Sequence, residues 1–363
     1  MNFTLILYIV FEMVSILFMY LAWKNRNDKI KKNRYFILSL LPFALLFVFR
    51  GLSVGKDYKT YADAYLSLID GTLDARQSEW LSPGFKLVCI FLSFFFHKNF
   101  YAVFAIINIL TLFLLYKSLL DNSENPPLSL FILFCFCIPF QIFNQFRQML
   151  ALSVTFFSLT FVKKRKFFPF LITILIAGMI HTSAFVILPI YFLFNLKLDR
   201  KKIIVFLIFA AIGFVFFDFF KSILANTYYG RIYFGSSFDV TEKSSIYNLI
   251  VRLIMFGGSY FYYKNVVKFK PDANILYWAV FICTLLQLLV VKSYILARLT
   301  TYFYIYYILL IPLVLNQFLV AKRRKNVLFV LFVCGMILYQ FVYYNSSSGA
   351  IRAGYNIYRT FFN

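Results

Sequence analysis

The sequence predicts an all-α, polytopic integral membrane protein with roughly 11–13 membrane helices, some of them short or re-entrant. Composition is the first indication: 62% of the 363 residues are hydrophobic, whereas soluble domains hold about 45–50% apolar residues. The mean hydropathy is +0.78. The apolar residues also fall into runs of about 20, the length of a membrane helix, and short basic linkers separate these runs.

The first run, residues 3–22, is expected to be a membrane helix, because it lacks the basic start and the small-residue cleavage site of a signal peptide. The other long runs are expected near 35–54, 99–118, 128–143, 145–162, 203–220, 247–263, 274–291, 299–320 and 326–344. Shorter apolar segments lie at 84–96, 167–181 and 182–196. Without an internal repeat or a soluble insertion, residues 1–363 are expected to form a single transmembrane domain.

The positive charge follows the linkers. Of the 37 Lys and Arg residues, 21 lie in five short runs, at 24–34, 163–166, 197–202, 264–270 and 322–325. Short basic loops mark the cytoplasmic side, so the long loops 51–82 and 221–246 are expected outside. A nucleic-acid partner is not expected despite the net charge of +23, because such a site needs one continuous basic stripe.

One short apolar segment is not expected to cross the membrane. Counting 84–96 and the next three runs as full spans would place the basic run 163–166 outside. We therefore expect 84–96, which begins at Pro83 and Gly84, to be re-entrant or interfacial. Residues 144–148 then lie near the external surface, and 167–196 forms a hairpin whose tip reaches outward.

The sequence offers no metal site. All five cysteines lie within apolar runs, where they are expected to behave as small hydrophobic residues. There are only two histidines and no cluster of His, Cys and carboxylate residues. No metal and no other cofactor is expected.

A polar patch interrupts the apolar sequence at "FNQFRQMLAL", residues 143–152. On a helix, Asn144, Arg147 and Gln148 would share one face. An arginine in the bilayer is costly and usually functional, although a snorkelling side chain that reaches lipid phosphate is the structural alternative. The adjacent amides favour function, since they too are poorly placed against lipid.

The external loop 51–82 holds five of the fourteen acidic residues, including Asp57. Tyr58, Tyr61 and Tyr65 have the spacing of one helix face. This pattern fits an amphipathic helix at the membrane surface. It equally fits an aromatic platform for a sugar, with carboxylates beside it to accept hydroxyl protons.

Other cations are expected near the same membrane face as Arg147. Arg50 and Arg298 lie near external ends of predicted spans, and Arg231 lies among tyrosines in loop 221–246. His181 lies at the expected hairpin tip, where a structural capping role is the alternative to a functional one. Such a cluster would suit a lipid-embedded ligand that carries phosphate.

Three segments resemble the EpsG family, which belongs with the Wzy-type polymerases of bacterial O-antigen, capsule and exopolysaccharide. They are "FRGLSVGKDYKTYADAY" (49–65), "FNQFRQMLALS" (143–153) and "IAGMIHTSAF" (176–185). They match, in order, an Arg-Gly…Val-Gly-x-Asp-Tyr-x-x-Tyr segment, an Arg-Gln-x-Leu-Ala segment and a His-x-Ser-Ala segment. The resemblance covers roughly residues 49–185.

The resemblance implies polymerisation of undecaprenyl-diphosphate-linked oligosaccharide repeats at the external face of the bacterial inner membrane. The growing chain would pass from one lipid diphosphate to a sugar hydroxyl of another lipid-linked unit. A chain-length regulator and a flippase are candidate protein partners.

This reaction needs charge stabilisation on the departing diphosphate and a base for the attacking hydroxyl. Arg147, with Arg50 or Arg298, is the candidate for the first role. His181 is the candidate base, and Asp57 is the competing base or a sugar anchor. The remaining candidate substrate-binding residues are Tyr58, Tyr61, Asn144, Gln148 and Arg231.

Three other functions stay open from the sequence. An O-antigen ligase would perform similar chemistry on a different acceptor. A flippase or transporter would be expected to show repeats and a polar path through the bilayer, and neither is visible here. A purely structural membrane protein would not need the polar patch around Arg147.

Overall fold

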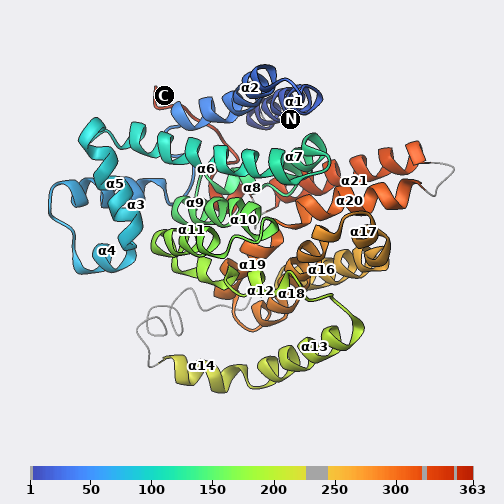
Figure 1. The fold of residues 1–363 in the computed structure, drawn as a ribbon. Coiled ribbons are helices and arrows are strands. Elements are labelled where there is room, and N and C mark those ends of the chain that lie inside the picture. The colour runs from blue at the N-terminus through green and yellow to red at the C-terminus, as the bar shows by residue number, and fades with distance from the viewer. Residues whose placement is uncertain (1–2, 226–243, 321–324, 347–349, 363) are drawn as a thin grey trace. The chain divides into compact units, whose positions relative to one another are not determined.

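The computed structural model describes residues 3–225, 244–320, 325–346 and 350–362, and helices dominate all four ranges (Figure 1). Within these ranges the β pairing amounts to an isolated antiparallel bridge between Arg50 and Thr360. The all-α class is therefore confirmed. The chain forms two compact units, unit 1 (Met1–Phe185 and Lys322–Asn363) and unit 2 (Val186–Ala321). The single transmembrane domain stays a prediction.

Unit 1 contains the N-terminal helices and the C-terminal segment of the chain. Within it α1 pairs with α2, and α9 packs between α6 and α11 (Figure 1). Its helices are α1 (Phe3–Lys24), α2 (Lys29–Val48), α3 (Tyr58–Ile69), α4 (Ala75–Trp80), α5 (Pro83–Phe96), α6 (Phe100–Asn122), α7 (Pro126–Cys135), α8 (Ile138–Gln141), α9 (Phe146–Phe157), α10 (Leu159–Lys163), α11 (Phe167–Ile180), α21 (Lys325–Asn345) and α22 (Ala350–Ala353).

Unit 2 is built around α18, which packs against α13, α16, α19 and α20. A 3₁₀ turn, η1 (Thr182–Ile187), leads into it. Its helices are α12 (Ile190–Leu193), α13 (Arg200–Val215), α14 (Phe217–Ala225), α16 (Ser244–Phe261), α17 (Tyr263–Phe269), η2 (Pro271–Ala273), α18 (Asn274–Val290), η3 (Tyr294–Leu296), α19 (Ala297–Tyr304) and α20 (Tyr307–Val320).

Several helices are long and apolar enough to cross a bilayer. Among the described residues, four meet both criteria: Phe3–Lys24, Phe100–Asn122, Pro271–Val290 and Lys325–Asn345. Two bent pairs raise the number to six if each is one span. At 1.5 Å per residue, the 22 residues of α1 extend about 33 Å, enough for the hydrocarbon core. The chain is a multi-pass membrane protein.

Polar side chains fix where several helices begin. Asp28, Asn99, Asn125 and Asp199 each accept a hydrogen bond from a backbone N–H in the first turn of α2, α6, α7 and α13. The first N–H groups of a helix have no partner inside it, and such caps satisfy one of them. The helices therefore start at the polar linkers that the sequence marks.

Several expected spans are broken in the structure. The expected span 128–143 divides into α7 and α8 at Cys137, whose φ of 54° lies in the left-handed region. The span 145–162 divides into α9 and α10 at Ser158. The second limb of the hairpin, 182–196, is a 3₁₀ turn followed by the four-residue α12. Hydropathy reports apolar length but not these local changes in backbone direction.

Both ends of α5 lie against the segment that contains α3 and α4. Ser82, at its start, follows directly after α4. At its end, the His97 carbonyl accepts a hydrogen bond from Tyr65 of α3, and Lys98 forms an ion pair with Asp70. The 14 residues of α5 extend about 21 Å, less than the thickness of the hydrocarbon core. The re-entrant or interfacial character of 84–96 stays a prediction.

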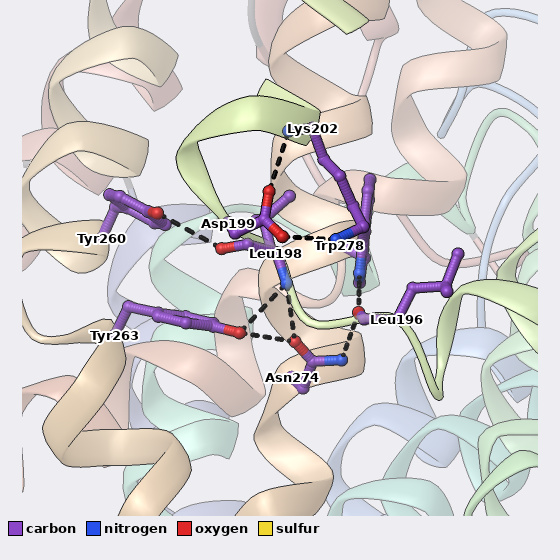
Figure 2. A network of polar contacts seen from close by, with 8 residues as sticks. All are labelled: Leu196, Leu198, Asp199, Lys202, Tyr260, Tyr263, Asn274 and Trp278. Carbon is purple, nitrogen blue, oxygen red and sulfur yellow. Dashed lines mark hydrogen bonds and ion pairs between the residues drawn. The ribbon is translucent and has the colours of Figure 1, made fainter. Parts of the chain in front are cut away.

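In unit 2, a polar network holds the linker between α12 and α13 (Figure 2). Asn274, at the start of α18, donates from Nδ2 to the Leu196 carbonyl (2.9 Å), and its Oδ1 accepts from the Leu198 N–H (3.3 Å) and the Tyr263 hydroxyl (2.9 Å). Trp278 donates from Nε1 to the same Leu196 carbonyl (2.6 Å). This linker carries part of the basic run 197–202, so the network fixes one of the basic loops.

A buried acid connects α1 with α21. Glu12 is buried within α1, and its Oε1 accepts a hydrogen bond from Gln340 Nε2 of α21 at 2.6 Å. Most of α21 is otherwise exposed, as expected for a helix that faces lipid. An ionisable residue inside the membrane normally has a polar partner, and here the partner is the amide.

Candidate functional site

Arg50 organises one end of unit 1. It follows α2 directly, is 0% exposed, and its guanidinium carbon lies 3.6 Å from the centroid of the Tyr58 ring. Its Nε donates to the Val54 carbonyl (3.1 Å), and its Nη2 donates to the Phe143 carbonyl, 93 residues away. These bonds tie the loop after α2 to the turn before α9. Arg50 therefore lies inside the protein and does not present its charge to a ligand here.

Gly55 makes this arrangement possible. Its φ is +89°, a backbone conformation that L side chains rarely adopt. A Cβ at this position would lie 2.0 Å from the Phe143 carbonyl oxygen, the same oxygen that binds Arg50. The glycine of the Val-Gly-x-Asp-Tyr segment is therefore required both for its conformation and for its close approach to the neighbouring backbone.

Asn144 makes a second connection between the same two segments. Its Oδ1 accepts a hydrogen bond from the backbone N–H of Asp57 at 2.9 Å. The expectation that Asn144 shares a helix face with Arg147 and Gln148 is wrong, because α9 begins at Phe146 and Asn144 lies in the preceding turn. The half-buried Asp57 side chain is thereby held at the start of α3.

Arg147 lies in the first turn of α9 and is half-buried. Its Nη1 donates to the Trp80 carbonyl, and its guanidinium carbon lies 4.6 Å from the Trp80 ring centroid. Its Nε donates to the Tyr61 hydroxyl in a long bond of 3.5 Å. Stacking and hydrogen bonds fix the plane of the guanidinium, which leaves Nη2 without a hydrogen bond within the described part of the chain.

The segment from Trp80 to Gly84 joins Arg147 to the His181 turn. Ser82 donates a hydrogen bond to the Ile180 carbonyl, the last residue of α11. A Cβ on Gly84 would lie 2.7 Å from the Met179 carbonyl carbon, so the two backbones are in close contact. Ser82, a partner of the turn that carries His181, therefore lies only two positions after Trp80, a partner of Arg147.

His181 ends α11 in an extended conformation and is half-buried. Its Nδ1 pairs with the Ser183 hydroxyl at 2.5 Å, a bond whose direction depends on the tautomer. This local bond supports the capping alternative. It also orients the imidazole, and if Nδ1 carries the proton then Nε2 is the basic nitrogen.

The tyrosine face of α3 is covered by protein. Tyr58, Tyr61 and Tyr65 are buried, as the one-face spacing allows, but their rings pack on Phe104, Phe146 and Trp80. The helix is amphipathic as expected, yet it presents neither a lipid-facing stripe nor a sugar platform. Burial raises the pKa of the Tyr58 phenol to about 12, so this hydroxyl stays protonated near neutral pH.

The C-terminal segment completes this end of unit 1. The Gly51 N–H donates to the Arg359 carbonyl (2.8 Å), and the Gly55 N–H donates to the Gly354 carbonyl (2.8 Å). Tyr8 of α1 donates to the Tyr355 carbonyl at 2.9 Å. Residues 353–360 therefore supply backbone partners to the loop that carries Arg50 and Gly55.

Three further residues were candidates for substrate binding. Gln148 is buried in α9. Arg298 lies on α19 of unit 2, whereas Arg147 lies on α9 of unit 1. Arg231 lies outside the described residues. Within the described ranges, no group of three or more His, Cys, Asp or Glu residues is placed to hold a metal ion.

Sequence reasoning missed Trp80, Ser82 and the segment 353–360. A lone tryptophan in a loop with several acids could have indicated Trp80, since arginine often stacks on tryptophan. The contacts of Ser82 and of the C-terminal segment join residues 98 and about 300 positions apart, and no local pattern reports such pairs.

The comparisons with known proteins agree with the three motifs. A model of the EpsG family matches residues 33–359. The chain belongs to the EpsG family. Neither curated proteins nor solved structures give a match. The EpsG family resembles the Wzy-type polymerases, and membership supports a polysaccharide-polymerase type of role.

The EpsG match is wider than the motif-bearing region. It extends through residues 353–359, whose backbone pairs with the loop after α2. In this EpsG-family chain, all three motif segments meet at one end of unit 1 through the hydrogen bonds of Arg50, Asn144, Arg147 and Ser82.

Proposed function

We propose that this protein polymerises undecaprenyl-diphosphate-linked oligosaccharide repeats at the external face of the bacterial inner membrane. The observation that carries the proposal is the chain of contacts from Asp57 and Asn144, through Arg147 and Trp80, to the His181 turn. It gathers a cation, a carboxylate and an imidazole at one end of a membrane-embedded helical unit. These are the groups that transfer of a glycosyl chain from a diphosphate requires.

In the proposed step, an acceptor sugar hydroxyl attacks the anomeric carbon of the growing chain. A C–O bond forms there as the C–O bond to the lipid diphosphate breaks, and the diphosphate leaves with the electron pair. The hydroxyl proton passes to His181 Nε2, or to Asp57 as the alternative base. Arg147 stabilises the developing negative charge on the diphosphate, for which its planar guanidinium suits two parallel hydrogen bonds.

Arg147 is supported for this role by its surroundings. Trp80 and Tyr61 hold the guanidinium in place. Within the described part of the chain Nη2 makes no hydrogen bond, so a ligand can bind it. A diphosphate oxygen could also replace the Trp80 carbonyl at Nη1. Arg50, by contrast, is fully buried, so we assign it the positioning of the loop rather than contact with substrate.

The test is reconstitution. Purified protein in lipid nanodiscs is given synthetic undecaprenyl-diphosphate-linked repeats, and products are separated on a gel. We expect a ladder of longer chains together with released undecaprenyl diphosphate. We expect the same ladder in the presence of EDTA, because arginine and not a metal ion is proposed to stabilise the charge. Unchanged single repeats from well-folded protein would contradict the polymerase.

The same assay separates the rival functions. A ligase would extend a lipid A core acceptor but leave lipid-linked repeats alone unpolymerised. A flippase would give no new covalent product and would move labelled repeats across a sealed vesicle. Either result would replace the proposed reaction.

A further inference from the structure

A cavity lies at the other end of unit 1, away from the Arg147 cluster. Its volume is about 310 Å³, and it is lined by Trp23, Arg26, Lys32, Leu120, Ser123 and Glu124. Lys32 lies in the first turn of α2, whereas Arg50 follows the last turn of the same helix. Phe104 of α6 packs on Tyr58 beside the Arg147 cluster, and Leu120 of the same helix lines the cavity. The two sites therefore lie toward opposite ends of α6, which is long and apolar enough to cross a bilayer.

Three linkers meet around this cavity. The α1–α2 linker supplies Arg26, with Trp23 and Lys32 from the adjoining turns of α1 and α2, and the α6–α7 linker supplies Ser123 and Glu124. Lys163, at the end of α10, donates from Nζ to the Asn122 carbonyl at 3.3 Å, which brings the basic run 163–166 to the same end. The basic loops that predict the cytoplasmic side therefore gather here.

The cavity is positively charged on balance. The nearby acids Asp28 and Asp121 already form ion pairs, with Lys31 (3.5 Å) and Lys117. Arg26 and Lys32 form no ion pair within the described part of the chain, and Glu124 is the one acid that lines the cavity. The Arg26 guanidinium lies 5.6 Å from the centroid of the Trp23 ring, which orients it.

The lining also has the polarity of a membrane interface. Trp23 is a partly buried tryptophan in the last turn of a membrane helix, the depth at which lipid headgroups lie. Leu120 adds an apolar wall beside the polar Ser123. Basic pockets between membrane helices on the cytoplasmic side suit lipid phosphate.

We propose that this cavity binds the phosphate of an anionic phospholipid from the cytoplasmic leaflet, with Arg26 and Lys32 as the ligands and Trp23 beside the glycerol backbone. The site is separate from the proposed polymerase chemistry. It gives the protein a specific lipid contact at the end opposite to the Arg147 cluster.

The experiment is native mass spectrometry of the full-length protein in detergent. Dioleoyl-phosphatidylglycerol is titrated in parallel with dioleoyl-phosphatidylcholine, and inorganic phosphate is added as a competitor. We expect tighter retention of the phosphatidylglycerol. The double variant R26Q/K32Q is expected to weaken it by about tenfold, since each basic residue near an anionic lipid contributes measurably.

The matched control is K29Q/K31Q, which removes the same charge from the first turn of α2 but from outside the cavity lining. It should change retention less than twofold. Glu124→Gln should strengthen retention, a gain that misfolding could not produce. Equal losses in the two double variants, or no preference for phosphatidylglycerol, would overturn the site. Competition by millimolar inorganic phosphate would overturn the lipid assignment in favour of a free phosphate ligand.

Discussion

At the scale of the residue, two arginines in similar sequence surroundings have different roles. Arg50 is enclosed by aromatic rings and backbone carbonyls, whereas Arg147 keeps part of its guanidinium available. Their sequence contexts do not reveal this, because neither context says which distant segment covers the side chain. The difference arises from the segments that cover them, Val54 and Phe143 for one and Trp80 for the other.

Arg147→Ala is expected to lower polymer yield in the nanodisc assay by about 100-fold, the usual cost of removing a group that stabilises transition-state charge. Arg147→Lys should recover only part of this loss, because an ammonium cannot form two parallel bonds. The matched control is Lys59→Ala, which removes one exposed positive charge from neighbouring α3. Wild-type ladders from Arg147→Ala would exclude the proposed role.

Gly55→Ala is expected to lower the free energy of unfolding by about 2–4 kcal/mol, from left-handed strain and from the clash with the Phe143 carbonyl. Gly71→Ala is the control: its φ is also positive, at 70°, but no atom lies within 4 Å of the added methyl group. It should cost only about 1 kcal/mol. Thermal unfolding in detergent measures both, and equal losses would contradict the close approach.

At the scale of the element, short helices and turns determine where the candidate site residues lie. α9 starts at Phe146 because the preceding turn is held by Asn144 and by the Phe143 carbonyl, and this places Arg147 in its first turn. The end of α5 contacts α3 and the residue that follows it, through His97 with Tyr65 and Lys98 with Asp70. In unit 2, the Asn274 network similarly fixes a linker too short to be a helix (Figure 2).

Asn274→Ala should loosen the α12–α13 linker, because it removes the bonds of Asn274 to the Phe194 and Leu196 carbonyls and to the Leu198 N–H. Trp278 keeps its bond to Leu196, and Tyr263 keeps its bond to Leu198. We expect trypsin to cut the basic run 197–202 at least several-fold faster in solubilised protein. Cleavage at 163–166, which lies in unit 1, is the internal control and should not change. An unaltered cleavage rate at 197–202 would show that the network is dispensable.

At the scale of the whole molecule, the contacts predict which residues lie on which side of the membrane. In a background lacking the exposed Cys334, single cysteines replace exposed Ser78, Lys98 and Lys31. A membrane-impermeant maleimide should label the first two in intact cells, because both ends of α5 face outward. Lys31→Cys should react only after permeabilisation. Labelling of just one end of α5 would make it a full span.

The gathering of Arg50, Arg147, Arg298 and His181 at one membrane face stays a prediction. The sequence predicted the all-α membrane class and the EpsG family, because hydropathy and short motifs are properties of the local sequence. It did not predict that Arg50 is buried, that Asn144 precedes the helix, or that the tyrosines of α3 face a core of Phe104 and Phe146. Each of these depends on which distant segment covers the residue, and a single sequence does not report such pairs.

The pairing of residues 353–360 with the loop at 51–56 also has a consequence for biogenesis. The ribosome makes this loop about 300 residues before its backbone partners. Membrane insertion of the intervening helices therefore precedes closure of this end of unit 1. A premature stop or a protease cut near residue 350 would leave a protein whose helices still insert into the membrane. Its loop at 51–56 would, however, lack the backbone hydrogen bonds from residues 353–360.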